Sequence, residues 1–261
     1  MSVNVSEELQ SRLTKVSRLL ISQPPPADEN SPYHVLAKKF HLKIDFKPFI
    51  EIEGTSLKDF RKQKVNILDH TAVIFTSRNA VDNFFRIVLE LKLELPIDMK
   101  YFCVTEQTAN YLQKYILIRK RKVFVGQKKA SDLFDIFKKH KGEKYLYPCS
   151  DVRQNDIPDY LKSINSQYTE AVFYRTVSSD MSEIKLNYDI IAFFSPSGIE
   201  SLKFNFPDFV QNGTRIAAFG PTTAKAVRDA GLILDIEAPL PNAPSMTGAL
   251  DEYIAKCNKT K

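Results

Sequence analysis

The sequence is poor in glycine, and glycine-rich nucleotide-binding motifs are absent from it. Glycine accounts for 8 of the 261 residues, whereas a usage of about 7% is average. Neither G-x-G-x-x-G nor G-x-x-x-x-G-K-[ST] occurs. The shortage argues against collagen-like and propeller folds, and the missing motifs exclude the common loops that cradle nucleotide phosphates.

Cysteine and histidine are also scarce and widely separated. The three cysteines show no C-x-x-C pair or zinc-ligand spacing, which favours reduced thiols over disulfides or a metal site. The four histidines form no H-E-x-x-H or paired arrangement, and we interpret them as structural or exposed. These residues are Cys103, Cys149, Cys257, His34, His41, His70 and His140.

Long apolar runs are missing as well. No stretch of about 18 apolar residues occurs, which predicts that the chain does not span a membrane. Glu7 and Glu8 stand where a secretory signal peptide would need positive charge. We therefore expect a cytoplasmic protein.

What the sequence does contain is an ordinary globular composition and enough length for two domains. Hydrophobic residues make up 43% of the chain and charged residues 26%, as in folded proteins generally. The length corresponds to roughly 1.7 domains of about 150 residues. Lys and Arg (37) exceed Asp and Glu (31), a mild excess that suits a small acidic substrate.

Short β-branched and aromatic runs alternate with helical patterns, which is typical of βα units that form a parallel sheet. We predict strands at 16–21, 43–52, 72–76, 100–104, 122–125, 145–148, 170–177, 189–194, 215–219 and 234–237. We predict helices at 32–40, 79–93, 106–115, 131–139, 156–164, 198–202, 222–230 and 245–256.

A weak repeat relates the middle of the chain to its end. Ile74–Ser77 resembles Phe193–Pro196, and a predicted helix follows each. Two further hydroxyl-bearing segments follow each copy at similar spacings, although chance similarity of such short strings is the alternative. Three matched units in a row predict two similarly built α/β domains.

The repeat leaves the N-terminal βα unit to pair with the C-terminal copy. We therefore predict a discontinuous domain made of 1–44 and 178–261, and an inserted domain at 53–170. The alternating charges of 45–52 and 171–177 predict a two-stranded connector between them. A ligand site in a cleft between the domains is then expected.

Four predicted strands run directly into hydroxyl-bearing turns that precede helices. Ligands bind outside the carboxyl ends of parallel strands, where helix N-termini offer N–H groups. Ser and Thr are also the preferred N-caps, so each alone is first interpreted as a cap. Together, beside Arg78, Arg153 and Lys225, they indicate an anion site. The turns are Thr76-Ser77, Ser150-Asp151, Ser195-Pro196-Ser197-Gly198 and Thr222-Thr223.

Two further features have more than one interpretation. The basic segment 119–129 holds six Lys or Arg in eleven positions. We interpret it as a solvated sheet edge, with nucleic-acid binding as the alternative. Tyr174 lies on the second connector strand, where it either faces the cleft or packs as a hinge aromatic.

Five segments, taken in order, resemble the uroporphyrinogen-III synthase family. They cover roughly 70–250 and are Val73–Val81, Tyr147–Asp151, Val172–Val177, Phe193–Gly198 and Phe219–Val227. The resemblance implies an α/β fold with two flavodoxin-like parallel-sheet domains, joined by a two-stranded β connector, the second domain being inserted into the first.

The resemblance also implies a lyase of haem biosynthesis that needs no metal or organic cofactor. Its substrate would be hydroxymethylbilane, an open-chain tetrapyrrole with eight carboxylates, which it cyclises to uroporphyrinogen III. Water is lost and ring D is inverted through a spiro-pyrrolenine. A monomer that receives this bilane from hydroxymethylbilane synthase, without nucleic acid or membrane partners, is expected.

Carried over position by position, Tyr174 matches the family tyrosine that assists loss of the hydroxyl group, as a proton donor or through a water. Arg153 and Lys225 would pair with substrate carboxylates. Hydroxyl and backbone N–H groups expected to bind the acetate and propionate side chains belong to Thr76, Ser77, Ser150, Ser195, Ser197, Gly198, Thr222 and Thr223.

An alternative function is a non-catalytic regulator of the same fold that binds a tetrapyrrole or another polyanion. Tyr174 favours the enzyme, because a pure binding protein does not need it.

Overall fold

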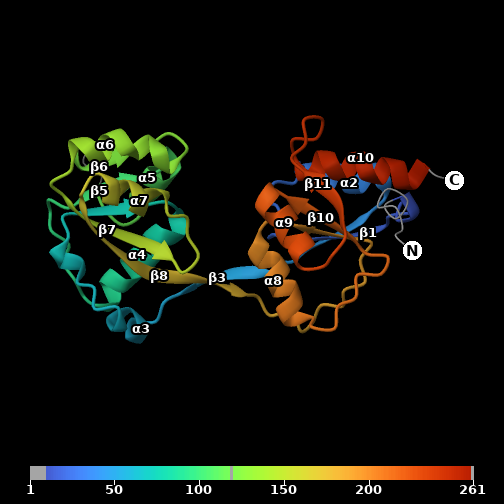
Figure 1. Cartoon of the computed structure of the whole chain (residues 1–261), viewed down its shortest axis with the longest axis horizontal. Coiled ribbons are helices and arrows are strands. Elements are labelled where there is room, and N and C mark those ends of the chain that lie inside the picture. Colours follow the sequence, from blue (N-terminus) through green and yellow to red (C-terminus); the bar gives the residue numbers. More distant parts are fainter. Residues whose placement is uncertain (1–9, 118–119, 260–261) are drawn as a thin grey trace. The chain divides into compact units, whose positions relative to one another are not determined.

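The computed structural model describes residues 10–117 and 120–259, which divide into two compact units (Figure 1). Residues up to Glu51 and from Val177 onward form the first unit, and Ile52–Thr176 form the second. The chain therefore passes between the units twice, within strand β3 (Ile50–Gly54) and within strand β8 (Gln167–Ser178). No helix in the described residues has the length and apolar character needed to cross a membrane.

The first unit contains a five-stranded parallel sheet in the order β11-β10-β9-β1-β2. Numbered along the chain within this unit, the strands follow the flavodoxin-like order 2-1-3-4-5. Its elements are β1 (Arg18–Ile21), α2 (Pro32–Phe40), β2 (Lys43–Phe46), β9 (Ile190–Phe193), α8 (Pro196–Asn205), β10 (Arg215–Phe219), α9 (Pro221–Asp229), β11 (Leu234–Ala238) and α10 (Met246–Lys259).

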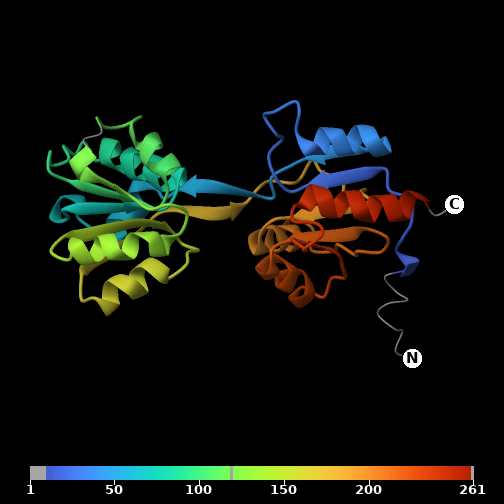
Figure 2. The ribbon, with the colours of Figure 1, turned by 90° about the horizontal axis from the view of Figure 1, so that it is seen from above.

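Helices cover both faces of this sheet (Figure 2). Successive strand residues point to opposite faces, so Leu19 and Ile21 pack with α2 and α10 whereas Leu20 packs with α8 and α9. All three side chains are fully buried. A strand covered on both faces must be apolar throughout, which explains its continuous hydrophobic run.

The second unit contains a six-stranded sheet in the order β3-β8-β7-β4-β5-β6. All pairs from β8 to β6 are parallel. Its other elements are α3 (Leu57–Lys62), η1 (Ile67–Asp69), β4 (Ala72–Phe75), α4 (Arg78–Glu90), β5 (Lys100–Cys103), α5 (Glu106–Leu112), η2 (Lys120–Lys122), β6 (Val123–Val125), η3 (Ala130–Leu133), α6 (Phe134–Lys139), β7 (Lys144–Ser150) and α7 (Asp156–Ser163).

Strand β3 pairs with β8 in the antiparallel direction. The N–H of Thr55 donates to the carbonyl of Phe173 at 2.9 Å, and the N–H of Ser179 donates to the carbonyl of Phe49 at 3.0 Å. Residue numbers thus rise on one strand as they fall on the other, which is the pattern of an antiparallel ladder.

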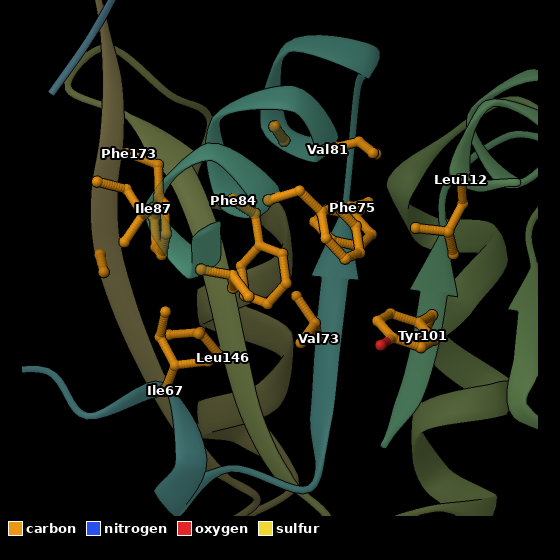
Figure 3. Close-up of a cluster of buried hydrophobic side chains, with 14 of the residues drawn as sticks. Ile67, Val73, Phe75, Val81, Phe84, Ile87, Tyr101, Leu112, Leu146 and Phe173 are labelled. Atoms are coloured by element: carbon orange, nitrogen blue, oxygen red, sulfur yellow. The ribbon is translucent and has the colours of Figure 1, made fainter. Parts of the chain in front are cut away.

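Aromatic side chains fill the core between the six-stranded sheet and α4 (Figure 3). The ring of Phe84 lies 5.4 Å from that of Phe75 on β4 and 5.7 Å from that of Phe173 on β8. Ile74 and Phe102 point to the other face, where they pack with α6 and α7. Helices on both faces hold the carboxyl ends of the strands in fixed positions.

The two sheets share one spatial layout although their chain orders differ. Strands β9, β10 and β11 are successive neighbours in one sheet, as β4, β5 and β6 are in the other. Beside β9 lie β1 and β2, in the places that β7 and β8 occupy beside β4. The predicted repeat coincides with the two sets of three strands.

The predicted strand at 43–52 is in fact two strands in different sheets. Pro48 has no N–H to donate to a ladder, and the chain leaves the first sheet there. Phe49 is fully buried, with its ring 5.1 Å from that of Phe193. The missing N–H of Pro48 and the burial of Phe49 therefore end β2 and separate it from β3, although the sequence pattern over 43–52 is typical of one strand.

Two helical segments also differ from the prediction. The helix predicted at 131–139 begins as the 3-10 turn η3 and becomes α-helical only at Phe134. Helix α3 has no counterpart among the predicted elements, although Ser56 caps it by accepting the N–H of Asp59 at 3.1 Å. Strand β8, for its part, begins at Gln167, earlier than predicted.

Candidate active site

The strand order of the second unit reverses between β4 and β7, since β4 connects to β5 on one side and β7 to β8 on the other. Open α/β sheets bind ligands outside the carboxyl ends of strands at such a point. Thr76 and Ser77 follow β4, and Ser150 ends β7. In the first unit the order reverses between β1 and β9, and Ser195 follows β9. Predicted site residues of both units thus lie where the strand order of their sheet reverses.

A cavity of about 910 Å³ opens at the carboxyl ends of β4 and β7, beside β8 at Tyr174. Four predicted site residues line it, namely Thr76, Ser150, Arg153 and Tyr174. Every lining residue belongs to the second unit. The volume lies near the upper end of the range for small-molecule sites.

Tyr174 reaches the cavity from β8 and is only 7% exposed. It lies opposite Ser150 where the β7–β8 register shifts, and such irregularities re-aim side chains. Its hydroxyl is 3.5 Å from Ser77 Oγ. Burial raises the pKa of the Tyr174 phenol, so at neutral pH this group is a hydrogen-bond donor and not a base.

Tyr147 is a second buried phenol of the cavity, and the sequence prediction does not include it. The Thr76 side chain interacts with the hydroxyls of both Tyr147 and Tyr174. Burial raises the pKa of Tyr147 to about 12, so it too stays protonated. Tyr147 is the first residue of Tyr147–Asp151, one of the five segments that resemble the family, and this position is the sequence signal that could have identified it.

Cys149 follows Tyr147 on β7 and also lines the cavity, but it is unsuited to nucleophilic chemistry. Burial raises the pKa of its thiol to about 11, and Sγ donates to the carbonyl of Ala171 at 3.4 Å. Because the thiolate is the reactive form, this cysteine serves as part of the wall. The rings of Phe134 and Tyr160 stack at 3.8 Å and supply another apolar part.

The hydroxyl of Ser150, which lines the cavity, and that of Ser77, which lies near Tyr174 but outside the lining, already have protein partners. Ser77 Oγ accepts the N–H of Ala80 at 3.2 Å and so caps α4. Ser150 Oγ donates to Asp151 Oδ1 at 2.9 Å. Both oxygens keep a lone pair or rotational freedom for a ligand, since a hydroxyl can donate once and accept twice.

The two predicted charge partners both take part in ion pairs. Arg153 is bonded to Glu170 on β8. Lys225 pairs with Asp229, one turn further along α9, at 2.5 Å and is largely exposed. A carboxylate ligand would have to compete with these side chains for either cation.

In the first unit, Ser195 caps α8 by accepting the N–H of Gly198 at 3.3 Å. A Cβ at Gly198 would lie 3.1 Å from Cδ1 of Phe193, so glycine permits this close packing. Ser197 is half-buried in the first turn of the same helix.

Helix α9 begins one residue earlier than predicted, at Pro221, after Gly220 with φ of 89°. Proline is favoured at the first helical position because its φ is already helical. Thr222 and Thr223 therefore lie inside the helix and do not cap it. Thr222 is exposed, whereas Thr223 is 1% exposed and belongs to the buried side of the helix.

Comparison with known proteins places this geometry in a family. No curated protein matches the chain. A mutant uroporphyrinogen III synthase from the extremely thermophilic bacterium Thermus thermophilus has 15% identity and a TM-score of 0.53, over 92% of this chain and 99% of that chain. The uroporphyrinogen-III synthetase of Helicobacter pylori 26695 has 18% identity and a TM-score of 0.55, over the same shares. At these identities the likeness concerns the fold.

The family described as uroporphyrinogen-III synthase HemD matches residues 31–248. Since that match spans most of the sequence, this chain belongs to the uroporphyrinogen-III synthase family.

Proposed function

We propose that the chain is an active uroporphyrinogen-III synthase, a lyase that cyclises hydroxymethylbilane to uroporphyrinogen III. One observation carries the proposal: in this member of the family a protonated, buried Tyr174 lines one cavity with Thr76 and Ser150, and its hydroxyl lies 3.5 Å from Ser77 Oγ. A donor phenol among hydroxyl groups suits the departure of a hydroxyl group from a carboxylate-rich substrate.

In the proposed reaction, Tyr174 donates a hydrogen bond to the leaving hydroxyl of the bilane, directly or through a water. The hydroxyl departs with a proton as water and leaves an azafulvenium cation. The substituted carbon of ring D attacks this cation to give a spiro-pyrrolenine. Cleavage and re-formation of a carbon–carbon bond invert ring D, and loss of a proton completes the macrocycle. The pyrroles supply the electrons, so the protein mainly folds the chain and stabilises charge.

The hydroxyl-bearing strand ends are proposed to bind the acetate and propionate side chains. In the second unit these are Thr76, Ser77 and Ser150. The first unit would contribute Ser195, Ser197, Gly198, Thr222 and the backbone N–H of the buried Thr223 in the first turn of α9, with Lys225 as a charge partner. Arg153 is the proposed charge partner in the second unit. The starts of α4 and α8 support this, because the N-terminal end of a helix favours negative charge.

The assay supplies freshly made hydroxymethylbilane, oxidises the products and separates the porphyrin isomers. We expect isomer III in the presence of the protein and isomer I in its absence, because spontaneous closure does not invert ring D. Isomer I alone in both reactions would overturn the proposal and leave a binding protein of the same fold.

A further inference from the structure

The basic segment 119–129, of which residue 119 lies outside the described residues, ends at the cavity. Lys128 and Lys129 lie in the loop between β6 and η3, and both line the cavity with Thr76 and Tyr174. Lys122, by contrast, pairs with Asp98 at 2.7 Å. The segment therefore does not act as one uniform basic edge.

The backbone that carries the two lysines is firmly held. One carboxylate oxygen of Asp132 accepts the N–H groups of Gln127, Lys128 and Lys129 at 3.1, 2.7 and 2.9 Å. These bonds lower the pKa of Asp132 and keep it ionised. Preceding them, the N–H of Gly126 donates to the carbonyl of Cys103 at 2.9 Å. The loop thus presents both side chains from a fixed position.

Close packing fixes the same loop at its start. A Cβ at Gly126 would lie 2.7 Å from the carbonyl oxygen of Val104, so only glycine allows this approach to the end of β5. A fixed backbone reduces the conformational freedom that ligand binding must remove.

Lys128 and Lys129 are both exposed. Among the ion pairs of residues 10–117 and 120–259 neither lysine takes part, and the charge of Lys129 is attracted by that of Asp132 in its own loop. Arg153 in the same cavity is instead bonded to Glu170. Asp156 and Asp159 also line the cavity, from α7. Their negative charges repel substrate carboxylates from α7. The loop with Lys128 and Lys129 is therefore the favoured place for these carboxylates to bind.

We propose that Lys128 and Lys129 are substrate-binding residues that bind the two carboxylates of one pyrrole ring. Each ring of the bilane carries an acetate and a propionate side chain, and two adjacent cations match that pair. The inference rests on the proposed function and deepens it, because it assigns a charge contact to residues that the family resemblance does not mark.

The test compares the double variant Lys128→Gln/Lys129→Gln with the control Lys138→Gln/Lys139→Gln. The control removes the same charge from the last turn of α6, outside the cavity lining. Unchanged circular dichroism and Tm would first establish that both variants are folded. KM and kcat for hydroxymethylbilane are then measured at low and moderate salt.

For the cavity variant we expect KM to rise about 2- to 30-fold, since two exposed ion pairs are lost. We expect kcat to stay within about twofold, and the rise of KM with salt to become shallower because charge contacts are screened. The control should match the wild type. A KM of the cavity variant that equals the wild-type value would overturn the inference, as would an equal rise of KM in the cavity variant and the control. A wild type that forms only isomer I would instead overturn the proposed function.

Discussion

Replacing Tyr174 by Phe separates a role in turnover from a role in stability. Its hydroxyl is 3.5 Å from Ser77 Oγ, which is long for an O–H···O bond. Loss of that contact and of the interaction with Thr76 should lower the free energy of unfolding by only about 0.5–1 kcal/mol, or Tm by roughly 1–4 °C. A positioned proton donor contributes about 100-fold or more to a rate. We therefore expect kcat to fall about 100-fold, equivalent to about 2.7 kcal/mol, with KM little changed.

Tyr101→Phe is the matched control for this experiment. Tyr101 is 5% exposed and belongs to the same hydrophobic cluster as Tyr174, but it does not line the cavity. Both variants should fold with similar Tm, while only Tyr174→Phe should slow the formation of isomer III. If kcat of Tyr174→Phe stayed within about threefold of the wild type, or if KM rose as much as kcat fell, the proton-donor role would be wrong.

Three further predictions concern pH and the cores. Because burial raises the pKa of Tyr174, kcat should show no loss from this donor between pH 7 and about 9.5; a loss centred near pH 8 in wild type but not in Tyr174→Phe would contradict it. Burial alone would raise the pKa of Asp189, yet the N–H groups of Ser17 and Arg18, at 2.7 and 2.8 Å, hold it below its usual value. Asp189→Asn should therefore destabilise the protein by about 1–2 kcal/mol at pH 7 in urea titration. The difference should shrink as pH falls from about 4, where the carboxyl group of the unfolded chain begins to protonate, through the lower pKa of the folded state; a constant difference would refute this. Phe84→Ala should lower the free energy of unfolding by about 3–5 kcal/mol, since its fully buried ring meets Phe75 and Phe173; a cost below about 1 kcal/mol would show that the cavity collapses.

Much of the fold follows from local patterns in the sequence. Strands such as Ala72–Phe75 and Ile190–Phe193 are buried on both faces, so their continuous apolar runs identify them. Gly231 has φ of 74° and ends α9 as its position predicts. The break at Pro48 was harder to foresee, because apolar residues continue on both sides of it and the change of sheet depends on distant strands.

The candidate site is predictable where hydroxyl groups follow strands and less so elsewhere. Thr76 and Ser150 do line the cavity. Tyr147 and the pair Lys128 and Lys129 reach it from positions whose side-chain direction depends on the sheet register and on the bonds to Asp132. Local pattern cannot supply that direction, because β7 is buried on both faces and a shift of its register by one residue would turn Tyr147 to the opposite face of the sheet.

The antiparallel pairing of β3 with β8 makes the whole second unit the loop of a β-hairpin. Glu51 and Val177, where the chain leaves and re-enters the first unit, lie between the bonds that join Phe49 to Ser179 and Thr55 to Phe173. Excising 52–176 would leave two chain ends already side by side, which a two-residue turn can join. The first unit could then be expressed as a minimal five-stranded protein, and each half could be altered or recombined as a separate module.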